Sequence, residues 1–576
     1  MANRSLMCTR RGLLGAAGAG VVTALASSRL LAQAAASARD ADAVVLNAKV
    51  HTVDPRLPQA EAFAIRSGRF IAVGSNEDIR ALIGNGTETF DAARASVVPG
   101  FIDAHNHAVG YDLLYEVSVG NPFEVEFVTI ASIVDKLAAR ARETQPGYWV
   151  EGFFYDDTKV KDQRAINVHD LDKVSREHPV AVHHRGGHTS YYNSKAFELA
   201  HITRDTPNPP GGTIDRGEHG DPNGRVTDRA LALLENVGRR PTFTAAQAAE
   251  RAKAAQAHIS RQFVRYGLTS VHHEQTESTA LAALESVREE GALLHRVYFA
   301  VSGPLLESMI ANGIRTGFGD EWLRFGTTFE HLVDGSFSER TMALSIPYPG
   351  SKSGYRGNLT ESQDELNAWI ERVHRAGIQV NCHANGDVAI AQVLTALEQA
   401  QHRYPLTDSR PKITHCTLIN DDLLRRIKAV GAVPAPFSSY AYYNSDKFHF
   451  YGEELMRRCM AYRSFIDAGI RAAAGSDFPP GPFAPLMGIQ GMVTRTGWNG
   501  ETWGAEQRIT PAEALQIYTL NGAYASHEER IKGSITPGKL ADYVVLSDDP
   551  HAVVPDRIKD IRVVRTVTGG RTVYQA

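Results

Sequence analysis

VVPGFIDAHNH, residues 97–107, decides the fold, because an apolar run ends there in two histidines one residue apart. Successive side chains of a β-strand point to opposite faces, so His105 and His107 face the same side and Asn106 faces the other. Two imidazoles at this spacing can bind one metal ion, with metal–nitrogen bonds of about 2 Å. An HxH alone is a weak indication, since packed or surface histidines show the same spacing. A metal site therefore needs ligands from elsewhere in the chain.

Later strand-like runs end in further metal-binding groups. His383 lies near the end of IQVNCHANGD, His415 lies in ITHCTLI, and Asp477 ends RAAAGSD. In a parallel barrel the carboxyl ends of all strands meet at one face, so ligands that are distant in sequence converge there. Together with the two histidines of the first strand, these three residues predict a metal site at that face.

The middle of the chain alternates strand-like runs with helical stretches, which is the pattern of a parallel α/β fold. We predict a TIM-like (β/α)8 barrel over residues 99–526. The candidate strands exceed by one the eight that a barrel needs, so we expect at least one of them to belong to an insertion around residues 112–240. Short alternating strands at both ends of the chain predict a small β-sandwich domain built from residues 35–98 and 527–576.

The N-terminus resembles a twin-arginine signal peptide, which we assign to residues 1–34. TRRGLL (9–14) precedes an Ala/Gly/Val run, and AQA (32–34) offers a cleavage site between small residues. The alternative is a membrane anchor, but the apolar run is shorter than a spanning helix and is interrupted by small residues. We therefore expect a periplasmic or secreted protein with no stable membrane anchor after cleavage.

Charge and cysteine content exclude some classes of partner. The 576 residues carry a formal net charge of −4, and no long basic run is present, so nucleic acid is not expected as a partner. Beyond the signal, Cys382, Cys416 and Cys459 form an odd set without paired spacing, which favours core packing over disulfides or metal binding. A small-molecule substrate is expected, and the sequence allows a homo-oligomer without specifying one.

Several motifs, in this order, resemble the amidohydrolase superfamily, in the branch that includes YtcJ-like proteins and N-substituted formamide deformylase. Besides VVPGFIDAHNH, they are GGHTSYYNSKAF (186–197), DGSFSERT (334–341), HANGD (383–387), THCTLI (414–419), GSDFP (475–479) and GSITPGKLADYVVL (533–546). The resemblance spans nearly the whole mature chain. It implies a metal-dependent hydrolase, but it does not name a substrate.

Glu330 departs from the pattern of that branch. Its members commonly carry a lysine four residues before the Asp-Gly pair, where the lysine is carboxylated and bridges two metals. Here that position is Glu330, and no lysine occurs between Lys253 and Lys352. A carboxylate offers two oxygens, each able to bind a metal at about 2.0–2.2 Å, so we expect Glu330 to be a ligand. Its side chain is shorter than a carboxylated lysine, so the number of metal ions, one or two, stays open. The alternative is that Glu330 forms an ordinary ion pair with a nearby basic side chain.

Asp477 and His188 are the predicted catalytic residues. A carboxylate that touches both a metal and its water can take the water's proton and later deliver it to the leaving group, and the metal lowers the pKa of that water to about 7. The segment around His188 approaches the active site in relatives, so this imidazole is expected to bind substrate and to polarise its carbonyl. The alternative for His188 is a packed turn.

Aromatic residues follow the seventh predicted strand, in residues 438–454. If the barrel assignment holds, Tyr440 and Tyr442 lie on the ligand side and can wall an apolar pocket, although they can equally pack the loop against its neighbours. If these tyrosines wall the pocket, the substrate is expected to be aromatic or hydrophobic.

The predicted activity is metal-dependent hydrolysis of a C–N bond in an amide, N-formyl, lactam or carbamate group. Zn²⁺ suits histidine and carboxylate ligands, at one or two ions per chain, as do manganese, iron and cobalt. Esters and lactones present the same carbonyl, and a non-catalytic periplasmic metal-binding or regulatory protein is a further alternative. Deamination is disfavoured because superfamily deaminases usually carry glutamate where this chain has Gly386.

Overall fold

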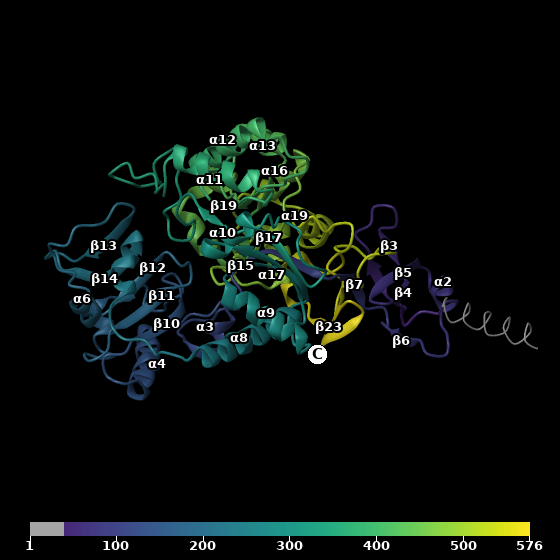
Figure 1. The fold of residues 1–576 in the computed structure, drawn as a ribbon, viewed down its shortest axis with the longest axis horizontal. Helices are drawn as coiled ribbons and strands as arrows, with labels where there is room; N and C mark the ends of the chain where they lie inside the picture. Colours follow the sequence, from purple (N-terminus) through teal and green to yellow (C-terminus); the bar gives the residue numbers. More distant parts are fainter. Residues whose placement is uncertain (1–39) are drawn as a thin grey trace, which may run out of the picture.

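The computed structural model describes residues 40–576 (Figure 1). The predicted signal peptide lies outside these residues. In the view of Figure 1 a sheet of the predicted insertion lies at the left, the central sheets lie in the middle, and strands from the chain ends lie at the right. Within the described part of the chain, no helix has the length and apolar character needed to cross a membrane.

The centre of the molecule is mixed α/β, with two four-stranded parallel sheets. The first has the order β17-β16-β15-β8 and contains β8 (Phe101–Asn106), β15 (Leu268–Thr276), β16 (Arg296–Val301) and β17 (Leu323–Thr328). The second has the order β18-β19-β20-β21 and contains β18 (His331–Leu332), β19 (Asn381–Ala384), β20 (Lys412–His415) and β21 (Val433–Ala435). Strands β8, β16, β19 and β20 are buried throughout, as expected where helices cover a parallel sheet.

Isolated backbone bridges connect these sheets. Thr327 pairs with Gln379, which joins the end of the first sheet to the approach of the second. Residues 470–478, predicted as a strand, form only single bridges, from Gly475 to Phe437 and from Phe478 to Asn106. Asp477 takes a left-handed φ of +56°, which interrupts a regular ladder and explains this difference.

Helices follow the central strands and bury apolar residues in the central core. They include α8 (Ala245–Arg265), α9 (Ser278–Glu289), α10 (Gly303–Ala311), α11 (Gln363–Arg375), α12 (Asp387–Arg403), α13 (Asp421–Val430) and α17 (Pro485–Thr494). Helix α11 shows the local cause. Ser362 caps it through the backbone N–H of Glu365, basic residues occupy its last turn, and its buried residues Leu366, Ile370 and Val373 recur at helical spacing.

A separate sheet lies within the range predicted for the insertion. It has the order β13-β14-β12-β11-β10-β9, with β9 (Val117–Ser118), β10 (Val150–Tyr155), β11 (Val180–His184), β12 (Thr189–Tyr192), β13 (Gly212–Arg216) and β14 (Pro222–Asp228). The run VAVHHRGGH contains β11 and therefore belongs to this sheet. This accounts for the candidate strand in excess of eight.

Strands from both chain ends share one sheet. Its order is β24-β23-β22-β7-β2-β3, with β2 (Lys49–His51), β3 (Gln59–Ala60), β7 (Ser96–Pro99), β22 (Tyr543–Leu546), β23 (Val563–Thr568) and β24 (Arg571–Gln575). A second sheet has the order β5-β4-β1-β6, with β1 (Ala43–Leu46), β4 (Ala62–Arg66), β5 (Arg69–Gly74) and β6 (Glu88–Asp91). Phe63 of β4 and Tyr543 of β22 meet in one apolar cluster, with ring centroids 5.0 Å apart.

Candidate metal centre

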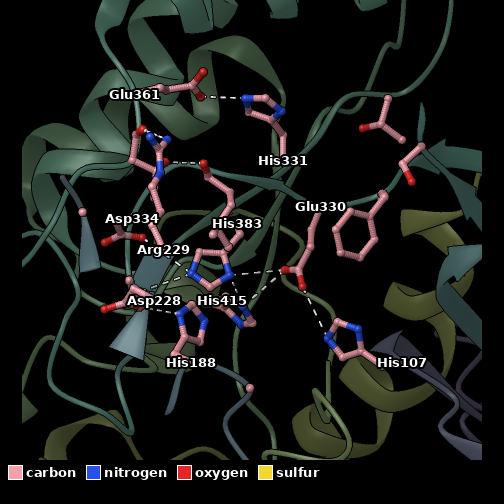
Figure 2. Close-up of a pocket in the computed structure, with 18 of the residues that line it drawn as sticks. His107, His188, Asp228, Arg229, Glu330, His331, Asp334, Glu361, His383 and His415 are labelled. Carbon is pink, nitrogen blue, oxygen red and sulfur yellow. Dashed lines mark hydrogen bonds and ion pairs between the residues drawn. The ribbon is translucent and has the colours of Figure 1, made fainter. Parts of the chain in front are cut away.

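The six predicted metal ligands meet at the carboxyl ends of the central strands. Figure 2 shows four of them: His107, Glu330, His383 and His415. His105 lies near the end of β8 and His107 directly follows that strand. Glu330 lies in the turn between β17 and β18, His383 lies in β19 and His415 ends β20. Asp477 lies in residues 470–478, which form single bridges to neighbouring segments. One ligand atom from each of four of these residues lies within 4.8 Å of the other three; the four are His105, Glu330, His415 and Asp477. Convergence of parallel strand ends places them there.

Glu330 lies at the centre of this group. Its Oε1 is 3.3 Å from Nε2 of His107. Its Oε2 is 3.4 Å from Nδ1 of His383, 3.4 Å from Nε2 of His415 and 3.6 Å from Nε2 of His105. Each carboxylate oxygen therefore faces a different set of imidazoles.

Asp477 closes the opposite side of the group. Its Oδ1 lies 3.0 Å from Nε2 of both His105 and His107. Burial opposes ionisation of this carboxyl, but the neighbouring histidines outweigh burial and hold its pKa below the usual range. His415, with φ of +69°, shares the left-handed conformation of Asp477; such strain is concentrated at functional sites.

The donor set fits a divalent metal ion. Oε2 of Glu330 is buried and has no hydrogen-bond partner among the described residues, although three imidazole nitrogens lie within 3.6 Å of it. A buried carboxylate oxygen without a hydrogen-bond partner, with imidazole nitrogens converging around it, is the arrangement that a cation would satisfy. Imidazole and carboxylate ligands suit zinc and several other first-row ions.

A buried ion pair behind the centre orients His105. Nδ1 of His105 lies 3.1 Å from Oε1 of Glu274, which accepts its hydrogen and so leaves Nε2 free to face the centre. Nζ of Lys412 donates to the same oxygen at 3.0 Å and to the Ala104 carbonyl at 3.0 Å. Sequence reasoning missed this pair. Its signal was one charged residue of opposite sign in each of two strand-like stretches, LTSVHHE and KITHC.

Hydrogen bonds join the Asp-Gly pair (334–335) to the HANGD motif (383–387) beside His383. The carboxylate of Asp334 accepts the backbone N–H groups of Ala343, Asn385 and Gly386, each at 2.8 Å. Nε2 of His383 lies 3.2 Å from the Gly335 carbonyl oxygen and 3.0 Å from Nδ2 of Asn385, and Nδ1 on the other side of the ring faces Glu330. The loop before α11 is thereby fixed against the end of β19.

His188 reaches the same site from the insertion, on the turn between β11 and β12. Its Nδ1 lies 3.1 Å from Oδ1 of Asp228, and its ring centroid lies 5.8 Å from that of His383 (Figure 2). Burial disfavours the charged imidazole, but the hydrogen bond to Asp228 and the charge of Glu339 outweigh burial and raise the pKa of His188 to about 9. The structure thus brings His188 to the wall of the metal site.

A cavity of about 1030 Å³ opens onto the metal centre. Among its lining residues are His107, Glu330, His383, His415, Asp477 and His188. Its apolar wall contains Leu306, Phe329, Leu332 and Trp369. The ring of Trp369 stacks on His331 at 3.9 Å between centroids, so part of this wall is held rigidly. The cavity is large enough for an aromatic molecule beside the metal centre.

Tyr440 and Tyr442, predicted to bind substrate, do not line this cavity. Tyr440 is 1% exposed and stacks on Phe437 at 3.8 Å between centroids, while the ring of Tyr442 lies under Nζ of Lys559. The aromatic segment folds into α14 (Tyr440–Tyr443) and a following 3₁₀ turn, and Tyr440 packs into a local apolar cluster with Phe337.

Fold and site together define a hydrolase whose chemistry depends on a metal ion. The model of the Amidohydrolase family matches residues 88–574, and the chain belongs to this family.

Two curated relatives match over almost their full length. N-substituted formamide deformylase of Arthrobacter pascens is 27% identical over 542 residues, which cover 93% of this chain and 98% of that protein. Putative amidohydrolase YtcJ of Bacillus subtilis (strain 168) is 26% identical over 542 residues, covering 91% and 98%. In fold, the chain is similar to the crystal structure of an uncharacterized metal-dependent hydrolase from Pyrococcus horikoshii OT3, with a TM-score of 0.69, 23% identity and coverage of 89% and 99%.

Proposed function

We propose that this hydrolase cleaves a C–N bond in an amide, N-formyl, lactam or carbamate group, on a substrate with an aromatic or hydrophobic part. The observation that carries the proposal is Asp477, whose carboxylate lies in the cavity wall within 3.0 Å of two ligand histidines. Cleavage of a C–N bond needs a proton delivered to a poor leaving nitrogen, and a carboxylate at this place can deliver it. The relative that acts on N-substituted formamides supports this bond type.

The ligands proposed for the metal are the six converging residues, with Zn²⁺ as the expected ion. Glu330 turns one oxygen toward His107 and the other toward His105, His383 and His415, so its two oxygens could help to hold one ion or two. When bound, a divalent ion would acidify a water molecule and polarise the substrate carbonyl. The fit of the donor set to such an ion rests on the unpartnered Oε2 of Glu330.

The protein's own groups then carry the proton and hold the substrate. Asp477 accepts the proton of the attacking water and passes it to the leaving nitrogen. His188, with Nδ1 turned to Asp228, has Nε2 available to donate a hydrogen bond to the carbonyl oxygen as negative charge develops there. Leu306 and Trp369 offer an apolar surface to the remainder of the substrate.

Three structural predictions stay proposals alongside this function. The bridges of Thr327 to Gln379, Gly475 to Phe437 and Phe478 to Asn106 support closure of the two central sheets into an eight-stranded (β/α)8 barrel. The shared apolar cluster of the terminal sheets supports a β-sandwich. Export directed by a signal peptide in residues 1–34 is tested by measuring the N-terminal mass of protein recovered from the periplasm.

A substrate panel tests the proposed bond type. Metal-loaded protein is assayed on N-substituted formamides, aryl amides and the esters of matching shape, with Asp477→Asn as the test variant and the exposed Asp421→Asn as its control. The expected result is amide or formamide turnover in wild type and control, and a loss of about 10²–10⁴-fold in Asp477→Asn, the usual contribution of a general acid–base residue.

Other outcomes of the panel select the alternatives. Turnover confined to esters and lactones would overturn C–N cleavage in favour of an esterase or lactonase on the same site. Bound metal without turnover of any substrate would favour a non-catalytic metal-binding or regulatory protein.

A further inference from the structure

A second group of metal-binding side chains lies at the sheet formed by the two chain ends. His51 ends β2, and Asp549 and His551 follow β22 in the sequence SDDPH (547–551). Strands β2 and β22 lie on either side of β7, so the N-terminal histidine and the C-terminal pair come together. Among the described residues, these three offer ligand atoms within 4.8 Å of one another.

The distances within this group match those of ligands around one ion. Nε2 of His51 lies 3.0 Å from Oδ1 of Asp549, and Nδ1 of His551 lies 3.4 Å from the same oxygen. Ligands bound tetrahedrally at about 2.0 Å lie roughly 3.3 Å apart, as the geometry of zinc sites requires. The backbone N–H of His551 donates to Oδ1 of Asp549 at 3.0 Å, which fixes the carboxylate in this direction.

His51 has a buried nitrogen that the protein leaves unsatisfied. The residue is 8% exposed, and its Nε2 has no hydrogen-bond partner within the described chain despite its closeness to Asp549. A buried polar atom without a partner is costly and calls for an explanation such as an ion.

We propose that His51, Asp549 and His551 bind one divalent transition-metal ion, of which Zn²⁺ is the probe of choice, at a site separate from the metal centre. Two imidazoles and one carboxylate are a ligand set used by zinc and iron sites. A cavity of about 790 Å³ lined in part by His51 and Asp549 adjoins the group, and the imidazole of His551 reaches the surface, so water can complete the coordination.

Such an ion would clamp the two ends of the folded chain together. Its ligands come from residue 51 and from residues 549 and 551, so binding requires β2 and the segment after β22 to stay in place beside β7. An ion that binds only the folded state stabilises that state by mass action. The role is structural, and hydrolysis at the separate metal centre does not need it.

The test counts zinc in the full-length protein. Chelator-stripped wild type, His551→Ala and Asp549→Asn are titrated with ZnCl₂ by isothermal calorimetry, and bound zinc is measured after equilibrium dialysis. His402→Ala, a change at another exposed histidine on α12, is the matched control. We expect both test variants to bind one zinc ion fewer per chain than wild type and His402→Ala, and to gain less in Tm on addition of zinc. Hydrolytic activity of the zinc-loaded variants stays within twofold of wild type.

Equal zinc content in wild type and both folded test variants would overturn the proposal. Loss of one zinc ion together with loss of hydrolytic activity would also overturn it, because that ion would come from the metal centre. Circular dichroism checks folding. Asp549→Asn retains an acceptor for the His551 N–H, so it guards against a loss caused by a disrupted turn.

Discussion

Replacing Glu274 by glutamine tests the ion pair that orients His105. The side chains of Glu274 and Lys412 are 0% and 1% exposed, and their charged atoms lie 3.0 Å apart. Glutamine keeps the shape and an acceptor for His105 but leaves Lys412 as a buried charge without its partner. Removing one member of a buried pair costs about 3–5 kcal/mol of folding stability. Loss of a group that orients a metal ligand lowers metal affinity by about 10–100-fold.

The assay separates these two effects. Unfolding by urea gives the stability, and calorimetric titration of the stripped protein with Zn²⁺ gives the affinity. Glu528→Gln is the matched control, because Glu528 forms an equally buried pair with Lys532 at 2.7 Å and touches none of the six ligands. We expect both variants to lose stability and only Glu274→Gln to lose zinc affinity. Equal zinc affinity in wild type and Glu274→Gln would refute the orienting role.

Three further predictions concern the metal and the cavity. Stripping the metal with a chelator abolishes hydrolysis and lowers Tm, and both return when metal is added back, since an ion present at 100 times its Kd stabilises the folded state by about 2.7 kcal/mol; scanning calorimetry with a parallel assay checks this. His188→Asn lowers kcat by about 10²–10³-fold with metal content unchanged, the size expected for loss of one donor to a developing oxyanion; unchanged kcat would contradict the role. Tyr442→Ala leaves KM within twofold, whereas Trp369→Ala raises KM for aromatic substrates about tenfold, which corresponds to about 1.4 kcal/mol; the reverse order would restore the aromatic loop as the substrate wall.

The convergence of the proposed metal ligands could be predicted from the sequence because side chains alternate along a strand. The spacing of His105 and His107 fixes their common face, and parallel strands bring His383 and His415 to the same edge. Asp477 lies 3.0 Å from both His105 and His107 even though its segment forms bridges rather than a strand. Such inferences need only local geometry and the rule that strand ends converge.

Features that depend on packing between distant segments could not be found in this way. The direction of the Tyr440 ring depends in part on Phe337, which lies far earlier in the chain and which no spacing rule relates to it. The pairing of Glu274 with Lys412 joins two strands 138 residues apart in sequence. A charged residue in a buried strand indicates that a partner is needed, but the sequence does not indicate which residue supplies it.

Metal content measures most directly whether Glu330 binds metal. Metal per chain is determined by mass spectrometry for wild type, Glu330→Gln and the control Glu361→Gln, which alters an acid at the cavity wall paired with His331. We expect Glu330→Gln to lose at least one metal ion per chain and its hydrolytic activity, while Glu361→Gln keeps its metal. Equal metal content and equal activity in wild type and Glu330→Gln would contradict this expectation.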